Sequence, residues 1–87
     1  MDKRNTFLGI DGFHRDKNED ARISLDVNSL FQTDTGKSVL KYLRSITIES
    51  VNGAGVTNDE LRHLEGQRYI VGLIESRMKH AQRVRNQ

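Results

Sequence analysis

One long stretch in the C-terminal part of the sequence constrains the fold more than any other feature. From Thr57 to about Arg83 nothing interrupts a helix, because the 87-residue chain has no proline and apolar residues recur every three to four positions. Thr57 and Glu60 also have the spacing of a capping box, in which each side chain binds the other residue's backbone amide. The predicted helix has about 25 residues and is about 38 Å long. Since this exceeds the size of so small a globule, we expect its far end to project or to lie on a neighbouring molecule.

Two shorter helices are predicted before the long one. The first covers Ser24 to Gln32, and the second starts after a cap at Thr33 or Asp34 and weakens near residue 46. Residues 49–56 connect it to the long helix through an Asn-Gly-Ala-Gly turn. The fold class predicted is mainly α: a helical hairpin with a short leading helix and an extended N-terminal arm. The expected apolar positions are Ile23, Val27, Leu30 and Phe31, then Val39, Leu40, Leu43 and Ile46, and finally Leu61, Leu64, Val71, Ile74, Met78 and Ala81.

The N-terminal part has a different pattern. Residues 1–20 are predicted to form an extended docking arm, and residues 21–87 a helical hairpin domain with a basic C-terminal end. Gly9 and Gly12 prevent a regular helix in the arm. A short apolar segment on a charged leader suits docking on another chain, and folding back over the chain's own core is an equally open alternative. The partner-binding residues expected in the arm are Phe7, Leu8, Ile10 and Phe13.

Composition sets the broad class of protein. The chain is 34% hydrophobic and 30% charged, and a domain this short buries only roughly 60–65% of its unfolded surface, so a thin core is expected. It has no cysteine, which excludes disulfides and thiolate chemistry and fits a reducing cytoplasm. No run approaches the ~18 apolar residues that a membrane span requires, and the charged N-terminus lacks the apolar region of a signal peptide. We expect a small helical part of a larger assembly.

One short motif resembles the end of a phosphate-binding loop. Thr35-Gly36-Lys37-Ser38 has the required ending, but that loop needs a glycine where this chain has Phe31, and a preceding strand. Without that glycine the backbone amides cannot surround a phosphate. No nucleotide site is therefore predicted.

Metal and catalytic sites are also not predicted. Residues 16–20 have the first oxygen ligands of an EF-hand loop, but its glycine and bidentate glutamate positions are Ala21 and Val27. The histidines have no partner at metal-ligand or catalytic spacing, so they are expected to be surface groups; they are His14, His63 and His80. The expectation is a protein that is not an enzyme and has no metal or cofactor.

Glu65, Gly66 and Arg68 form a second group of candidate partner-binding residues. Glycine inside a helix costs about 1 kcal/mol relative to alanine, so Gly66 is expected to have a packing reason. Either a partner approaches closely there, or Gly66 packs against Tyr42 or Phe31 of the same chain. Glu65 and Arg68 are three residues apart on one helix face and can pair with each other or with a partner.

The charge is unevenly distributed. Residues 1–75 contain 10 basic and 12 acidic residues, whereas residues 76–87 contain four basic residues and no acid. A basic end indicates contact with phosphate or with an acidic surface, although cations also favour the C-terminal end of a helix. An alternative function is therefore binding to the phosphate backbone of nucleic acid. The residues expected to do this are Arg77, Lys79, Arg83 and Arg85.

Two motifs carry a resemblance to a known family. They are Phe31-x-Thr33-x-x-Gly36-x-x-Val39-Leu40-x-x-Leu43 and, after a loop, Leu64-Glu65-Gly66-x-Arg68-x-x-Val71. Together they span roughly residues 30 to 75 and resemble small tailed-phage proteins named after an open reading frame of a Bordetella phage (the Bbp-nineteen-like phage domain). The resemblance implies a gene product from a virion-structure neighbourhood, with no catalytic residues to carry over.

From the resemblance and the apolar arm we expect a small structural component of a tailed-phage virion. It would bind other virion proteins at the portal, the head–tail connector or an internal core, through the arm and the long helix, in a multi-copy symmetric assembly. The implied locations are the virion and, during assembly, the host cytoplasm. Contact with packaged DNA is compatible with the basic end, and no membrane partner is expected.

Overall fold

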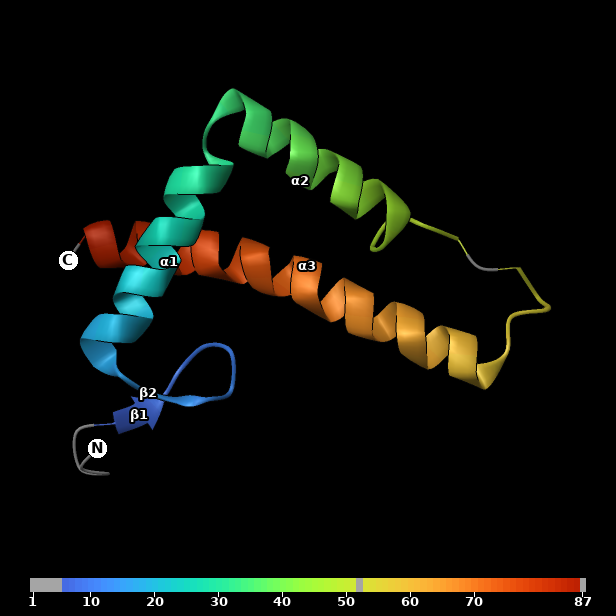
Figure 1. Ribbon diagram of the computed structural model, residues 1–87, viewed down its shortest axis with the longest axis horizontal. Coiled ribbons are helices and arrows are strands. Elements are labelled where there is room, and N and C mark those ends of the chain that lie inside the picture. Colours follow the sequence, from blue (N-terminus) through green and yellow to red (C-terminus); the bar gives the residue numbers. More distant parts are fainter. Residues whose placement is uncertain (1–5, 52, 87) are drawn as a thin grey trace.

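Three helices and one small sheet make up the computed structural model, which describes residues 6–51 and 53–86. This confirms the mainly α fold class expected from the sequence. Along the chain the elements are β1 (Thr6–Leu8), β2 (His14–Asp16), α1 (Lys17–Phe31), α2 (Asp34–Ile46) and α3 (Asn58–Arg85). Figure 1 shows α1 crossing the C-terminal half of α3, with the β-hairpin beside the crossing.

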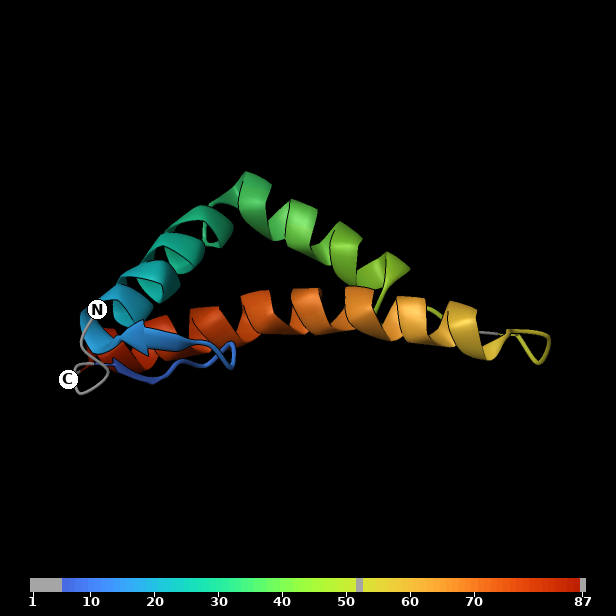
Figure 2. The same cartoon turned by 60° about the horizontal axis from the view of Figure 1, so that its bottom comes forward.

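The helices form the three sides of an open triangle. α3 is the base, α1 rises from its C-terminal half, and α2 returns so that its end meets the middle of α3 (Figure 2). The molecule measures 48 × 33 × 17 Å and has a radius of gyration of 15.7 Å. A compact domain of this length has a radius of gyration of about 12 Å. α2 and α3 thus make the expected hairpin-like arrangement, but an open one.

The long helix has the start that its sequence predicts. The Thr57 hydroxyl accepts from the backbone N–H of Glu60 (3.1 Å), and the Glu60 carboxylate accepts from the backbone N–H of Thr57 (3.2 Å). These two bonds satisfy amides that the first turn would otherwise leave free. α3 then continues for 28 residues.

The corner between α1 and α2 is closed by Thr33 and Gly36. The Thr33 hydroxyl donates to the carbonyl oxygen of Leu30 (2.9 Å) and accepts from the backbone N–H of Gly36 (2.9 Å). Gly36 is buried, and a Cβ at this position would overlap the Leu30 carbonyl oxygen and lie 2.8 Å from the Phe31 Cα. This explains the spacing of threonine and glycine in the first family-like motif: the corner has no room for a side chain.

The N-terminal segment differs from the extended arm that was expected. Residues 6–16 form an antiparallel hairpin in which Phe7 pairs with Arg15 and Leu8 with His14, and Gly12 supplies the positive φ of its turn. α1 begins at Lys17 rather than at Ser24, because Glu19 and Asp20 in its first turn favour the positive end of the helix. The boundary expected at residue 20 therefore falls inside α1.

The core is thin, as expected, and it is unexpectedly polar. Among the residues that the structure describes, Val71 and Ala81 are the only hydrophobic residues that are buried. The buried polar residues are Asp20, Ser24, Asn28, Thr47 and Arg77. The first three recur every four positions, so α1 packs on α3 with a polar stripe. Of the predicted apolar positions, Ile23, Val27 and Phe31 are half-buried, whereas Leu30 is exposed.

Candidate functional site

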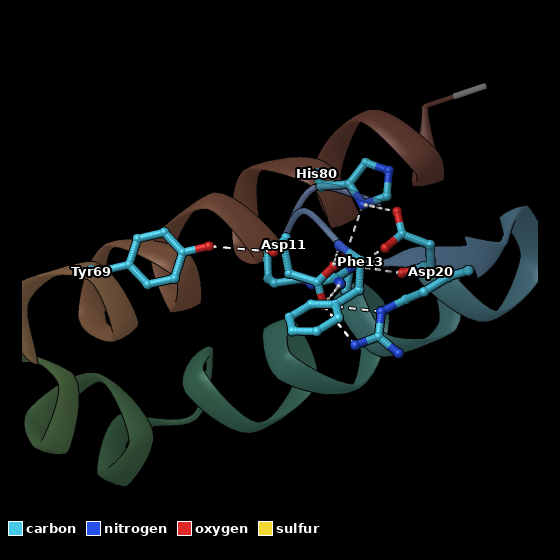
Figure 3. A network of polar contacts seen from close by, with 8 residues as sticks. Asp11, Phe13, Asp20, Tyr69 and His80 are labelled. Carbon is cyan, nitrogen blue, oxygen red and sulfur yellow. Dashed lines mark hydrogen bonds and ion pairs between the residues drawn. The ribbon is translucent and has the colours of Figure 1, made fainter. Parts of the chain in front are cut away.

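Arg77 is the centre of a buried polar cluster. Its Nη1 donates to Asp20 Oδ1 (2.7 Å), to the Asp20 carbonyl oxygen (2.9 Å) and to Ser24 Oγ (3.0 Å). Its Nη2 lies 3.2 Å from Asp11 Oδ2. Figure 3 shows Asp11, Asp20 and His80 close together in this network. We call Asp11, Asp20, Ser24, Arg77 and His80 the Arg77 cluster.

The Arg77 cluster joins the hairpin, α1 and α3. Asp11 lies in the hairpin turn region, Asp20 and Ser24 are on α1, and Arg77 is on α3. An isolated two-stranded hairpin is marginal in water, so its ion pair to Arg77 is a main reason that it stays attached. The Arg77 cluster therefore holds these three parts of the chain together, a role that was not predicted from the sequence.

This position of Arg77 corrects the proposed nucleic-acid contact set. Arg77 is 3% exposed and already holds two carboxylates, so it cannot also reach a phosphate backbone. Arg77 lies three residues after Ile74 and four before Ala81, which are both apolar positions of the long helix. This spacing was the sequence signal that Arg77 faces the rest of the chain. Lys79, Arg83 and Arg85 are exposed, and nucleic-acid binding by these three residues stays a prediction.

His80 is not the isolated surface group that was expected. Its Nδ1 lies 2.6 Å from Ser24 Oγ and 4.0 Å from Asp20 Oδ2, an oxygen that accepts no hydrogen bond. Serine, histidine and aspartate are also the residue types of a hydrolase triad. However, Ser24 is fully buried, so its hydroxyl is closed to a substrate. The contact serves to hold α1 on α3.

Asp11 is the most strongly perturbed carboxyl group. The guanidinium of Arg15 donates to its Oδ2 (2.9 Å), and the backbone N–H of Phe13 donates to its Oδ1 (3.1 Å). The Arg15 hydrogen bond is the largest reason that the pKa of Asp11 is lowered to about 2; the Phe13 bond and the charges of Arg15 and Arg77 add to it and outweigh the effect of burial, which raises the pKa. Asp11 is thus a stable anion that secures the hairpin.

This pKa shift predicts a loss of stability in acid. Because the pKa of Asp11 falls from 3.8 in the unfolded chain to about 2 in the fold, its contribution is complete above pH 4 and disappears as the pH falls to about 2. We expect urea unfolding of the Asp11→Asn variant to lack that part of the pH dependence between pH 4 and 2. Asp26→Asn, which removes an exposed partner of Arg22, should keep it. Equal pH profiles for wild type and Asp11→Asn would contradict the assignment.

Arg68 ties the end of α2 to the middle of α3. Its Nε donates to the Thr47 carbonyl oxygen (2.9 Å), and its Nη2 donates to the Ser50 carbonyl oxygen (3.0 Å). Its Nη1 pairs with Glu65 Oε1 (2.8 Å), which is the pairing within one helix face that the spacing allowed. Arg68 therefore has a structural role, while Glu65 is largely exposed.

Gly66 shows no packing reason among the residues that the structure describes. Beyond its chain neighbours and the backbone of its own helix, a Cβ built on Gly66 would meet no described heavy atom within 4 Å. The expected contact of Gly66 with Tyr42 or Phe31 is therefore wrong. Close approach by another molecule is the alternative that stays a prediction.

Apolar side chains of the β-hairpin are exposed. Phe13 is 67% exposed, Leu8 is 61% exposed and Phe7 is 39% exposed, whereas Ile10 is half-buried. We call Phe7, Leu8 and Phe13 the hairpin surface; Phe7 and Leu8 follow one another in β1 and therefore point to opposite faces of the two-stranded sheet. The Tyr69 hydroxyl donates to the Asp11 carbonyl oxygen (3.3 Å), as Figure 3 shows, so α3 also supports the hairpin. All four arm residues lie in this hairpin, and three of them are exposed.

The part of the chain that the structure describes has neither a metal-binding group of side chains nor a membrane-spanning helix. In residues 6–51 and 53–86, no three His, Cys, Asp or Glu side chains are grouped as a metal site would need. No helix in those residues is both long and apolar enough to cross a membrane.

Comparison with known proteins adds no relative. No family model, no curated protein and no solved structure matches this chain. The resemblance to the Bordetella-phage family and the role that it implies therefore stay predictions.

Proposed function

We propose that this chain is a small structural protein, not an enzyme, and that it binds other proteins in a multi-copy assembly. The observation that supports this most strongly is a contrast among the described residues, between two buried hydrophobic residues and a much larger set of exposed ones. Much exposed apolar surface on a small protein commonly marks binding to another protein. The exposed large hydrophobic residues are Phe7, Leu8, Phe13, Leu25, Leu30, Val39, Tyr42, Ile46, Val51, Leu61, Tyr69 and Ile70.

The hairpin surface is the proposed site for a different protein. Its side chains project from a backbone that is held by Asp11, Arg77 and Tyr69. A backbone that is already held in place loses little conformational entropy on binding, which favours affinity. The Arg15 guanidinium carbon lies 5.6 Å from the centroid of the Phe13 ring, above its face. This contact positions the Phe13 ring before a partner binds.

The resemblance gives this proposal a setting. A small tailed-phage protein with exposed apolar anchors fits a place among other virion proteins, at the portal, the head–tail connector or an internal core. In that setting the protein would be found in the virion, and in the host cytoplasm during assembly. In that setting α3 would lie along a neighbouring subunit and stabilise its position.

Incorporation into particles tests the proposal. We expect mass spectrometry of purified, nuclease-treated particles of the encoding phage to find the protein at a small multiple of six or twelve copies. The double variant Leu8→Asp, Phe13→Asp should reduce incorporation at least tenfold, because burying each apolar side chain contributes about 1.5–3 kcal/mol. Both residues are exposed, so circular dichroism should show an unchanged helix content.

A matched control separates this surface from exposed apolar residues in general. Val51 is 94% exposed and lies in the loop between α2 and α3. The Val51→Asp variant should be incorporated like wild type. Absence of the wild-type protein from mature particles would contradict the structural role. Equal incorporation of wild type, the double variant and Val51→Asp would show that the hairpin surface does not contribute to incorporation.

A further inference from the structure

One face of α2 is exposed over the whole length of the helix. Its members follow the spacing of three and four residues that places side chains on one side of a helix, and each of them is exposed. We call this set the α2 face: Thr35, Ser38, Val39, Tyr42, Ser45 and Ile46. Tyr42 is the largest member and is 61% exposed. The face is about three turns long.

Contacts within the chain use a different side of α2. Arg44 pairs with Glu75 of α3, and the carbonyl oxygen of Thr47, just after α2, accepts from Arg68. Leu40 and Leu43, on that side, are half-buried. α2 lies at the edge of the molecule in both views (Figures 1 and 2). The α2 face is therefore a side of α2 that this chain leaves uncovered, and its apolar members are Val39, Tyr42 and Ile46.

The absence of charge on the α2 face favours a second copy of the same chain as its occupant. The charged residues of this helix, Asp34, Lys37, Lys41 and Arg44, all lie outside the face. When two identical faces meet, any charge in the contact tends to meet a like charge, and like charges repel. A neutral face avoids that repulsion. It also lacks the charges by which an interface commonly selects a different partner.

The sizes of the side chains fit two antiparallel copies of α2. Tyr42 lies near the middle of the face, with Ser38 one turn before it and Ser45 one turn after it. Around a two-fold axis through this region, each Tyr42 ring would enter the space over the small serines of the other copy. The Ser45 hydroxyl already donates to the Tyr42 carbonyl oxygen (2.6 Å). Burying the Ser45 hydroxyl in the contact therefore leaves its own O–H satisfied.

The exposed area of the chain is large enough for such a contact. The accessible surface is 6533 Å², whereas a compact protein of this mass exposes about 5,200 Å². The excess is roughly 1,300 Å², and a standard protein interface buries about 800 Å² on each partner. One interface of standard size would bring the exposed surface close to that of a compact protein.

We propose that the α2 face is a homodimer interface in which two copies of this chain pack α2 against α2 in an antiparallel orientation, with Tyr42 at the centre. This inference is independent of the proposed function, because it uses another surface and another partner. The hairpin surfaces of both copies stay free in such a dimer.

Analytical ultracentrifugation of the full chain tests the dimer. We expect wild type to sediment as twice its 10.0 kDa mass at micromolar concentrations. Tyr42→Asp should raise the dissociation constant at least 100-fold, because it places two like charges at the centre of the contact. Lys41→Asp introduces the same residue one position away, outside the face, and should stay dimeric. Circular dichroism checks that both variants fold.

Cysteine crosslinking tests the orientation. The chain has no cysteine, so single variants report one site each. In an antiparallel pair, a mixture of Ser38→Cys and Ser45→Cys proteins should form the mixed disulfide in preference to either disulfide between identical variants. A predominance of disulfides between identical variants would overturn the antiparallel arrangement.

Two results would overturn the interface itself. One is a folded wild type that is monomeric up to about 200 µM, a concentration well above typical dissociation constants of specific dimers. The other is an equal dissociation constant for wild type and Tyr42→Asp. If the double variant Leu8→Asp, Phe13→Asp abolishes the dimer instead, the hairpin surface is the contact and the α2 face is not. A monomer that still enters particles would leave the proposed function standing.

Discussion

Replacing Arg77 with methionine should destabilise the fold by about 3–5 kcal/mol, the typical cost of removing one partner from a buried ion pair. The change leaves the fully buried Asp20 carboxylate without its cation and removes the ion pair between Asp11 and α3. A domain of this size has a total stability of roughly 5–10 kcal/mol, so the variant would lose about half of its stability. Urea unfolding followed by circular dichroism at 222 nm measures the loss.

Arg83→Met is the matched control for Arg77→Met. Arg83 is on the same helix but is exposed, and such surface changes usually stay within about 0.5 kcal/mol. A double-mutant cycle with Asp20→Asn should then give a coupling above about 1 kcal/mol between Arg77 and Asp20. If Arg77→Met costs no more than Arg83→Met, the Arg77 cluster does not hold the fold together.

Gly36→Ala should also be strongly destabilising, by about 2–4 kcal/mol. The added methyl group would overlap the Leu30 carbonyl oxygen, and forcing an atom into a closely packed site typically costs 1–3 kcal/mol. Moving the backbone aside would also weaken the Thr33 cap, a loss of about 1 kcal/mol. We expect a lower urea midpoint and a weakened connection between α1 and α2.

Gly66→Ala is the same substitution at an open helix position and should have the opposite sign. Because nothing lies within 4 Å of the new methyl group, the higher helix propensity of alanine should stabilise the chain by about 1 kcal/mol. Equal effects of the two variants would contradict the described corner. A stabilised Gly66→Ala protein that fails to enter particles would place Gly66 at a contact with another molecule.

The parts of the fold that were predictable are those specified by near neighbours in sequence. The Thr57 capping box and the Thr33 cap each join residues only three apart, so their side chains reveal them directly. The start of α1 was missed because Glu19 and Asp20 were assigned to the N-terminal arm, residues 1–20. In fact two acids in a row also suit a first helical turn.

The candidate site was less predictable, because its contacts are distant in sequence. Arg77 and Asp20 are 57 residues apart in the sequence. The net charge of residues 76–87 does not distinguish a buried cation from an exposed one. Which cation is buried depends on carboxylates at the other end of the chain. The exposed apolar residues of the hairpin were identified, but their attachment through Asp11 depends on the same distant contact.

The polar core has a consequence for how stability varies with temperature. Apolar surface exposed on unfolding raises the heat capacity, and polar surface lowers it. With Asp20, Ser24, Asn28 and Arg77 in place of apolar residues between α1 and α3, the single chain should show a heat-capacity change below the usual 12–15 cal/mol/K per residue. Its stability curve would be flat, with little sensitivity to cold. Calorimetry of assembly should then show a negative heat-capacity change, because the exposed apolar side chains are buried when the protein binds its partners.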